Sequence, residues 1–154
     1  MNDIPIPDAL RALTADDLDR VVAIDAQLAG RTRRQFYRKR LEAALARPQD
    51  FIYLGYDAGG RLDGFLMARL LEGEFGGTEP IAVIDTLGVD PECFGAGLGR
   101  ALMQGLEALL RRKGITEIQT QADWRNFTLL RFLAYWGFEV APRHVLERRF
   151  AAPR

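Results

Sequence analysis

Three glycines at alternate positions stand directly before a long helical pattern, and they constrain the fold of this 154-residue chain more than any other feature. The stretch reads VDPECFGAGLGRALMQGLEALLRRKG and runs from Val89 to Gly114. A glycine inside a helix costs about 1 kcal/mol relative to alanine, so glycines gathered at a helix entrance indicate that something must approach the backbone there. The stretch therefore predicts a turn that leads from a strand into a helix with an open N-terminal end.

An open helix N-terminus is suited to an anion. It offers about four N–H groups without helical partners and roughly half a positive charge from the aligned peptide dipoles. Gly95, Gly97 and Gly99 remove side chains from this end, and Arg100 adds a cation beside it. The favoured ligand is a phosphate or pyrophosphate. The alternative is that the glycines only form a tight strand-to-helix turn.

Two common phosphate-binding motifs do not fit this stretch. A Walker loop has Gly-Lys-Ser/Thr after its glycines, whereas Gly99 is followed by Arg100 and Ala101. A dinucleotide fingerprint has GxGxxG tight against the first strand of a domain. Here the spacing is GxGxG, and Asp90–Phe94 separate it from the strand. A nucleotide-binding regulator is therefore disfavoured.

Hydrophobic periodicity predicts a mixed, α+β-like α/β fold made of one domain, residues 1–154, with a central, mostly antiparallel sheet flanked by helices. The expected strands are Ala9–Leu13, Phe51–Asp57, Leu62–Glu72, Ile81–Val89, Ile115–Gln121, Phe138–Val140 and Val145–Phe150. The expected helices run between Thr14 and Gly30, over about Arg33–Arg47, from the glycine stretch onward, and over Asn126–Trp136. Side chains expected to be buried on these helices include Leu28, Leu45, Leu98, Leu102, Leu106 and Leu109.

Charge and composition exclude several function classes. Lys+Arg and Asp+Glu balance at 21 each, so no global field directs the chain to nucleic acid or to an anionic membrane. One cysteine and one histidine exclude a His/Cys zinc cluster, and no metal is expected. No apolar run approaches the roughly 20 residues of a membrane span, and the N-terminus lacks the pattern of a signal peptide. We expect a cytoplasmic protein.

The motif V-D-P-E-x-x-G-x-G-L-G-R-A-L, which begins at Val89, resembles the acetyl-CoA-binding motif of the GNAT-type N-acetyltransferase superfamily. The segment WRNFTLLRFLAYWGFEV looks like that family's Asn-helix-Gly-Phe segment, with Asn126 and Gly137-Phe138 at matching positions. The order of expected elements is also the family's order, so the resemblance covers nearly the whole chain. It implies the GNAT-type fold and acetyl-CoA as co-substrate.

The resemblance also implies a role for individual positions. The backbone of a strand that splays from its neighbour would bind the pantetheine arm, and the glycine turn would hold the pyrophosphate. Asn126 would contact the cofactor from the far side of the cleft. The implied cofactor-binding residues are Leu87, Gly88, Val89, Gly95, Ala96, Gly97, Leu98, Gly99, Arg100 and Asn126.

The implied reaction is direct attack of a primary amine on the acetyl carbonyl. The acceptor, a small molecule or a peptide, would enter across the first two helices and the loop Glu72–Pro80. An edge strand near the C-terminus is compatible with a homodimer. The chain departs from the family pattern at three positions, where Phe94 replaces a polar phosphate contact, Leu133 a tyrosine acid and Gln121 a glutamate base.

Three carboxylates remain as candidate general bases: Asp85, Glu74 and Asp123. Asp85 lies within IAVIDTLGV, and burial among apolar neighbours would raise its pKa toward the range of a base. The alternatives are that Asp85 stabilises a backbone kink or pairs with an arginine, and that water relays the proton without a dedicated base.

The sequence therefore predicts an N-acetyltransferase that moves an acetyl group from acetyl-CoA to a primary amine. Because Gln121 and Leu133 occupy the positions of base and acid, a non-catalytic acyl-CoA-binding sensor or partner-binding module is the alternative. The segment Arg31–Arg40 is rich in arginine and either forms a solvated face with local ion pairs or recognises an anionic substrate.

Overall fold

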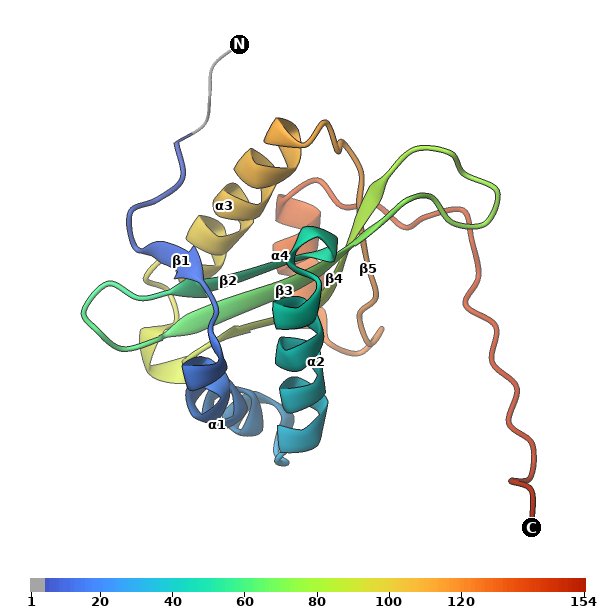
Figure 1. Cartoon of the computed structure of the whole chain (residues 1–154), viewed down its shortest axis with the longest axis horizontal. Helices are drawn as coiled ribbons and strands as arrows, with labels where there is room; N and C mark the ends of the chain where they lie inside the picture. The colour runs from blue at the N-terminus through green and yellow to red at the C-terminus, as the bar shows by residue number, and fades with distance from the viewer. Residues whose placement is uncertain (1–4) are drawn as a thin grey trace. The chain divides into compact units, whose positions relative to one another are not determined.

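A five-stranded sheet in the order β1-β2-β3-β4-β5 organises the first part of the chain (Figure 1). The computed structural model describes residues 5–154. The chain divides into two units, Met1–Gln121 and Ala122–Arg154. The strands all belong to the first unit and are β1 Leu10–Ala12, β2 Phe51–Tyr56, β3 Gly64–Leu71, β4 Ile81–Val89 and β5 Ile118–Thr120. The first four strands pair antiparallel and β4 pairs with β5 in parallel, which confirms the predicted, mostly antiparallel mixed sheet. The single domain over residues 1–154 stays a prediction.

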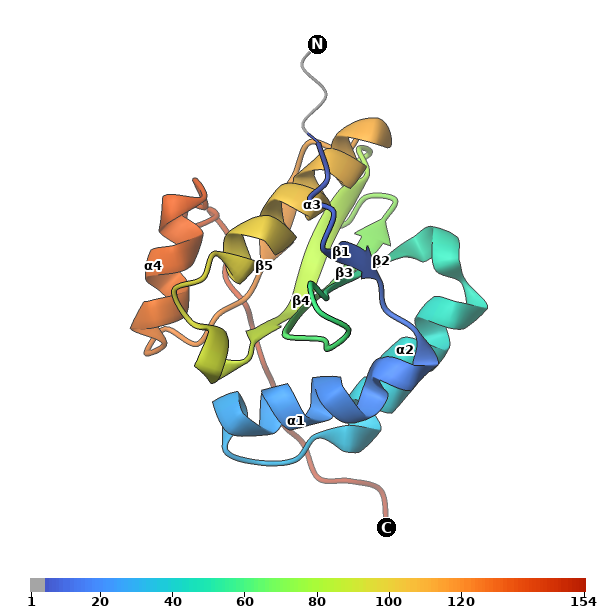
Figure 2. The ribbon, with the colours of Figure 1, turned by 90° about the vertical axis from the view of Figure 1, so that its left-hand side faces the viewer.

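Three α-helices of the first unit cover the two faces of this sheet. They are α1 Leu18–Ala29, α2 Arg34–Ala46 and α3 Leu98–Arg112, with short 3-10 turns η1 Ala15–Asp17, η2 Pro48–Asp50 and η3 Pro91–Cys93. Helices α1 and α2 lie on one face and α3 lies on the other (Figure 2). The sheet therefore has two different faces: α3 covers one, and the helical hairpin formed by α1 and α2 covers the other.

Local sequence signals set the start of η1, which leads directly into α1, and the end of α1. The N–H of Thr14 donates to the Asp17 carboxylate at 2.7 Å, which forms the capping-box contact at the start of the helical segment. Gly30 ends α1 in the left-handed conformation, with φ of 71°, and its N–H donates to the carbonyl of Ala26.

Burial on the helices differs from the expectation at three leucines. Leu28 is 45% exposed and Leu45 is 56% exposed, so their predicted burial is wrong. Helix α3 buries Leu110 fully, whereas Leu109 is only half-buried, because the buried stripe runs by four-residue steps from Leu102. Hydrophobic residues on a short amphipathic helix outnumber the positions that face the sheet, and the excess stays at the surface.

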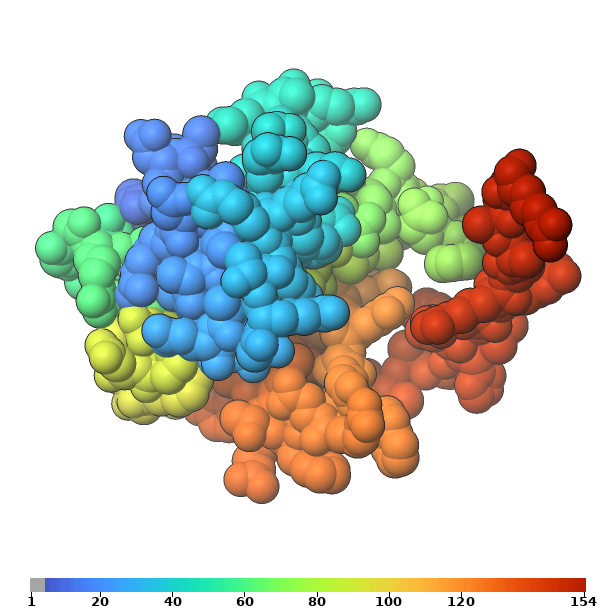
Figure 3. Space-filling model, turned by 90° about the horizontal axis from the view of Figure 1, so that it is seen from below, coloured from blue at the N-terminus to red at the C-terminus, as the bar shows by residue number. Residues whose placement is uncertain are grey.

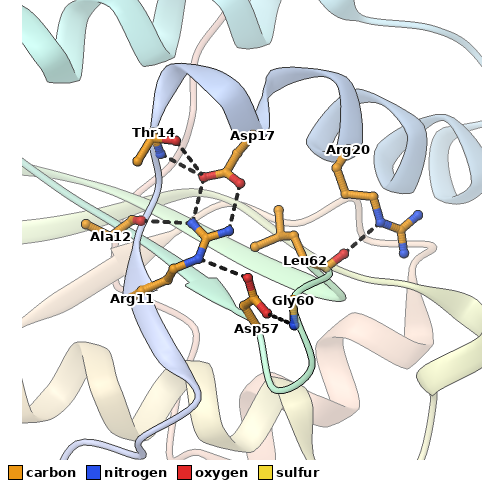
Figure 4. Close-up of polar contacts among 8 residues, drawn as sticks. All are labelled: Arg11, Ala12, Thr14, Asp17, Arg20, Asp57, Gly60 and Leu62. Carbon is orange, nitrogen blue, oxygen red and sulfur yellow. Dashed lines mark hydrogen bonds and ion pairs between the residues drawn. The ribbon is translucent and has the colours of Figure 1, made fainter.

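An ion-pair network joins β1 to the following turn and to the β2–β3 hairpin (Figure 4). Arg11 donates from both terminal nitrogens to Asp17, at 2.8 Å each, and from Nε to Asp57 at 3.2 Å. Asp57 in turn accepts the N–H of Gly60 at 2.7 Å. Arg11 holds the pKa of Asp17 below its ordinary value, although burial acts in the opposite direction. The edge strand β1 is thereby fixed to its neighbours by side chains as well as by the ladder.

A second polar cluster locks α1 to α2. Asp25, which is buried, accepts from Nε of Arg33 at 2.8 Å and from the hydroxyl of Tyr37 at 2.9 Å. Burial would raise the pKa of Asp25, but the bonds from Arg33 and Tyr37 outweigh it and hold the pKa below the ordinary 3.8. Tyr37 is fully buried and packs edge-on against Phe65 of β3. The two helices are therefore joined by buried polar bonds, and Tyr37 packs the pair against the sheet.

This cluster predicts an acid-dependent stability. Because the pKa of Asp25 is lower in the folded protein, its contribution is complete above about pH 4 and is lost as the pH falls through the folded value. We expect Asp25→Asn to lower the free energy of unfolding at pH 7 by about 1–3 kcal/mol, and the difference from wild type to shrink below pH 4. Urea unfolding at pH 7 and pH 3 measures both values. Asp19→Asn, whose carboxylate is exposed, is the matched control, and a pH-independent difference for Asp25→Asn would contradict the pKa assignment.

The second unit contains helix α4, Phe127–Tyr135, followed by a segment without regular structure. Asn126 caps α4, since its Oδ1 accepts the N–H of Leu129 at 3.2 Å. The predicted strands Phe138–Val140 and Val145–Phe150 are wrong, because no residue from 138 to 154 is in a strand. Alternating hydrophobicity produces a strand only where a neighbouring strand accepts the hydrogen bonds, and these residues pair with no strand in the described part of the chain.

Candidate functional site

The C-terminal half of β4 has an open edge on the side of β5. The parallel pairing joins Ala82–Ile84 to Ile118–Thr120 and then stops, with the hydroxyl of Thr120 donating to the carbonyl of Ile84 at 2.9 Å. Among residues 5–154, Thr86–Val89 pair with β3 only, and Asp85 has no partner in either ladder. Backbone donors and acceptors of an unpaired strand edge are available to a ligand that lies along it.

The glycine in this open segment is required by close packing. A Cβ on Gly88 would lie 2.7 Å from the ring of Phe65, which is almost fully buried and cannot move aside. The same position lies 3.5 Å from Cδ1 of Leu28, one of the leucines that stays exposed. Leu28, near the end of α1, thus lies over the C-terminal part of β4, where it stays partly exposed.

The turn before α3 presents its backbone to solvent. Gly95 and Gly97 both have positive φ, 81° and 84°, and a Cβ at either position would meet nothing within 4 Å. The helical hydrogen bonds of α3 begin with the N–H of Ala101, which donates to the carbonyl of Gly97 at 3.0 Å. The N–H groups of Leu98 and Gly99 precede that bond and point out of the helix end. Phe94 is 62% exposed beside this turn. The turn has the geometry of an anion site built from main-chain donors.

A buried carboxylate fixes the glycine turn to α1. Asp90 follows β4 and accepts the N–H of Glu92 at 2.9 Å, which caps η3. Its other oxygen pairs with Arg20 of α1, and Arg20 also donates from Nε to the carbonyl of Leu62 at 2.7 Å (Figure 4). These bonds, those from Arg20 first, lower the pKa of Asp90. Figure 3 shows the turn, in yellow, lying against the blue atoms of α1.

The structure places Asp85 at an irregularity of β4. Met67 of β3 pairs with Thr86 and Ala68 pairs with Ile84, so Asp85 is the extra residue of a β-bulge. Its carboxylate accepts from Nε of Arg69 at 3.0 and 2.8 Å. Nη1 of Arg40, on α2, lies 3.6 Å from the same carboxylate. The expectation of apolar neighbours is wrong, and the arginine-pairing alternative describes the observed geometry.

The two other candidate bases occupy exposed positions. Glu74 lies in the loop between β3 and β4, and its carbonyl accepts the N–H of Gly77. Asp123, in the second unit, pairs with Arg125 at 3.2 Å, and this bond lowers the pKa of Asp123. A carboxylate with a lowered pKa is a weaker proton acceptor, so this geometry does not favour Asp123 as a base.

The second unit carries the other residues singled out by the resemblance. Asn126 uses its side-chain oxygen as the cap of α4, and Leu133 is buried in that helix. Gln121 ends the first unit, one residue after β5.

Most arginines of the segment Arg31–Arg40 take part in ion pairs. Arg33 pairs with Asp25, Arg34 with Asp19, Arg38 with Glu42 and Arg40 with Asp85. The segment is therefore largely a set of local ion pairs, as one of the two interpretations predicted. Arg40 differs from the others because it shares its partner with Arg69.

Sequence reasoning missed Arg20 and Arg69, and it left open what the segment Arg31–Arg40, which contains Arg40, contacts. Arg20 lies on α1, Arg40 on α2 and Arg69 on β3. Arg20 pairs with Asp90, which follows β4, whereas Arg40 and Arg69 both pair with Asp85 of β4. The only local signal was the placement of Asp85 and Asp90 in otherwise apolar or turn sequence, because an acidic residue there requires a partner.

No helix within residues 5–154 is long and apolar enough to cross a membrane.

Comparison with known proteins identifies the family. A model of the acetyltransferase (GNAT) family matches residues 15–138. A mycothiol acetyltransferase of Clavibacter michiganensis subsp. michiganensis is 32% identical over 146 residues, which are 92% of this chain and 45% of that protein. The aminoglycoside N(6′)-acetyltransferase type 1 of Stenotrophomonas maltophilia is 30% identical over 110 residues, 70% of this chain and 72% of that protein. The chain spans about half the length, or less, of the mycothiol acetyltransferases that it matches.

Solved structures share the fold. The structure of AAC(6′)-Iy in complex with the bisubstrate analog CoA-S-monomethyl-acetylneamine has a TM-score of 0.76 at 18% identity and covers 92% of this chain and 97% of that one. The PaiA N-acetyltransferase from Thermoplasma acidophilum in complex with coenzyme A has a TM-score of 0.71 at 18% identity and covers 88% and 91%. With the family match over most of its length, the chain belongs to the acetyltransferase (GNAT) family.

Proposed function

We propose that the protein transfers an acetyl group from acetyl-CoA to a primary amine. The observation that carries this proposal is the junction of two main-chain surfaces, the open edge of β4 and the exposed turn at the start of α3. The strand edge suits an extended arm with amide groups, and the helix turn suits a phosphate. Acetyl-CoA contains both groups, the pantetheine arm next to the thioester and the pyrophosphate beyond it. Membership of the GNAT family and the named activities of relatives support the same assignment.

The residues present fit the cofactor. Backbone groups of Leu87, Gly88 and Val89 would hold the pantetheine arm, and the free space at Gly95 and Gly97 admits a pyrophosphate to the helix end. The further residues of this site in the first unit would be Ala96, Leu98, Gly99 and Arg100, and the family resemblance adds Asn126. Phe94 supplies no polar contact, so the site would bind phosphate through main-chain donors and the helix dipole.

When bound, acetyl-CoA supplies a thioester whose acetyl carbon an amine can attack. A C–N bond forms, the C–S bond breaks, and the thiol of CoA leaves while the amine loses one proton. A backbone N–H of the open β4 edge near Val89 would stabilise the oxygen of the reacting carbonyl. With Asp85 held by two arginines, we propose that water carries the amine proton away, with Glu74 as the remaining carboxylate on the acceptor side.

A two-stage experiment tests this function. Calorimetric titration should show micromolar binding of acetyl-CoA and CoA but not of ATP or NAD. A panel of amines should then release free thiol from acetyl-CoA in the presence of the protein. Selective CoA binding with no thiol release from any amine would contradict the transferase and leave a binding protein.

The second candidate is an acyl-CoA-binding module without turnover. Two observations favour it: Gln121 and Leu133 stand where the family pattern has a base and an acid, and Asp85 is occupied by ion pairs. Such a module would bind acetyl-CoA and CoA as tightly as an enzyme does, so only turnover separates the two candidates.

The Asp90 anchor provides a prediction about cofactor binding. Asp90→Ala removes the cap of η3 and the partner of Arg20, so the glycine turn loses its fixed position. We expect about tenfold weaker acetyl-CoA binding and a loss of about 1–2 kcal/mol in the free energy of unfolding. Asp63→Ala is the matched control, since Asp63 also contacts Arg20 but its side chain does not cap the turn. Equal affinities of the two variants would show that the anchor does not shape the site.

A further inference from the structure

Two arginines from different elements converge on one carboxylate, on the sheet face that carries α1 and α2. Arg69 of β3 donates from Nε to both oxygens of Asp85, and Nη1 of Arg40 lies 3.6 Å away. The guanidinium of Arg40 also lies over the ring of Phe36, 4.9 Å from its centroid. Two cations thus share one anion, and this arginine cluster, Arg40, Arg69 and Asp85, keeps one net positive charge.

The arginine cluster has more hydrogen-bond donors than acceptors. A guanidinium carries five N–H donors, whereas the hydrogen bonds of Arg69 among the described residues come from Nε alone. The hydroxyl of Tyr53, within electrostatic range of the cluster, is buried and has no partner among residues 5–154. Burial and the charge of Asp85 raise the pKa of Tyr53 to about 12, so its hydroxyl remains a neutral donor. The position therefore has a surplus of donors and of positive charge.

The cluster is also open to solvent. The side chains of Arg40 and Arg69 are each 35% exposed, although Asp85 itself is mostly buried. Each arginine is held by its contact with the carboxylate, and Arg40 also by the Phe36 ring, so their outer N–H groups lose little freedom when they bind. A planar carboxylate matches such groups in both charge and geometry.

We propose that the arginine cluster binds a carboxylate of the amine acceptor. This inference rests on the proposed acetyl transfer and adds its substrate class, an amine that carries an acid group. The placement agrees with that role, because α3, which the cofactor turn leads into, covers one side of the sheet (Figure 2) and the arginine cluster lies on the other, beside α2. An acceptor that approaches the thioester from the helical-hairpin side passes Arg40 and Arg69.

The position of Asp85 on β4 sets the length of the acceptor. Asp85 precedes the segment Leu87–Val89 by two to four residues, and a strand rises by about 3.3 Å per residue, so roughly 7–13 Å separate the arginine cluster from the acetyl site. The amine of an α-amino acid is too close to its own carboxylate to span this distance. A terminal amine on a flexible chain of several carbons spans it, and 6-aminohexanoate is such a compound.

A matched pair of acceptors tests the proposal. Hexylamine has the same carbon chain as 6-aminohexanoate but lacks the carboxylate. For the wild-type protein with acetyl-CoA, we expect kcat/KM, measured by thiol release, to be at least about tenfold higher for 6-aminohexanoate. Arg40→Met should reduce this ratio toward one. Arg38→Met, on the same helix and paired at 4.0 Å with exposed Glu42, is the control and should keep the ratio.

The results separate this inference from the proposed function. Equal kcat/KM for the two amines in the wild type, or an unchanged ratio in Arg40→Met, would overturn the carboxylate site. Calorimetric titration of the CoA-bound protein with both compounds provides a readout that needs no turnover. Binding that requires the carboxylate and is lost in Arg40→Met supports the site even if acetyl transfer fails, and no carboxylate-dependent binding overturns it. Arg40→Lys keeps the positive charge but lacks the planar guanidinium that can bind both oxygens of a carboxylate, so it should retain part of the binding.

Discussion

Gly97→Asp is expected to abolish acetyl-CoA binding while the protein stays folded. The substitution places a carboxylate in the open space at the start of α3, where the pyrophosphate would meet the helix N–H groups. Like charges at such a site cost several kcal/mol, so we expect an affinity at least about 100-fold weaker. Calorimetric titration of the purified variant with acetyl-CoA measures this loss.

The control must separate backbone strain from charge repulsion. Gly114 also has positive φ and free space for a side chain, but it lies just beyond the opposite end of α3. Gly114→Asp should therefore carry a similar strain of about 1–2 kcal/mol and keep its affinity for acetyl-CoA. An unchanged affinity in folded Gly97→Asp would remove the glycine turn from the cofactor site.

Leu102→Ala is expected to give the largest loss of stability. Leu102 is fully buried on α3, and its Cδ1 lies 3.3 Å from the position of a Cβ on Gly64, at the start of β3. Removal of the side chain leaves a cavity between helix and sheet, which costs about 2–5 kcal/mol in the free energy of unfolding. Urea unfolding followed by circular dichroism measures the change.

Leu45→Ala is the matched control for this cavity. Leu45 is a leucine on a helix as well, but it is 56% exposed, against the expectation from its sequence position. Its truncation should change the free energy of unfolding by less than about 0.5 kcal/mol. Losses of equal size in the two variants would contradict the arrangement of α2 and α3 on the sheet.

The parts of the fold that local chemistry determines could be predicted from the sequence. Thr14 marks the start of η1, which leads into α1, and Gly30 marks the end of α1, because a capping box and a left-handed cap depend only on neighbouring residues. Strands β2, β3 and β4 follow from their hydrophobic content and from the glycine-rich turn between the first two. The segment Val145–Phe150 shows the limit, because its alternating pattern is that of a strand whose partner the sequence cannot supply.

The candidate site was predictable in its backbone and not in its side chains. The glycine turn is encoded by consecutive residues, so the positions of Gly95 and Gly97 at the start of a helix follow from the sequence alone. The environment of Asp85 depends instead on the register of β4 against β3 and on the packing of α2. One extra residue in the ladder turns Asp85 toward Arg69, and no local pattern encodes such a shift.

The open edge of β4 and the turn before α3 present main-chain atoms, which every amino acid possesses. Apart from the glycines that the backbone requires, at positions 88, 95 and 97, substitutions along these segments can therefore accumulate over evolutionary time without erasing the shape that CoA would recognise. Acceptor choice would instead depend on a few side chains such as Arg40 and Arg69, and one mutation can redirect it. Descendants of such a chain would keep the same acyl donor while exchanging acceptors, so the two halves of the reaction would be inherited at different rates.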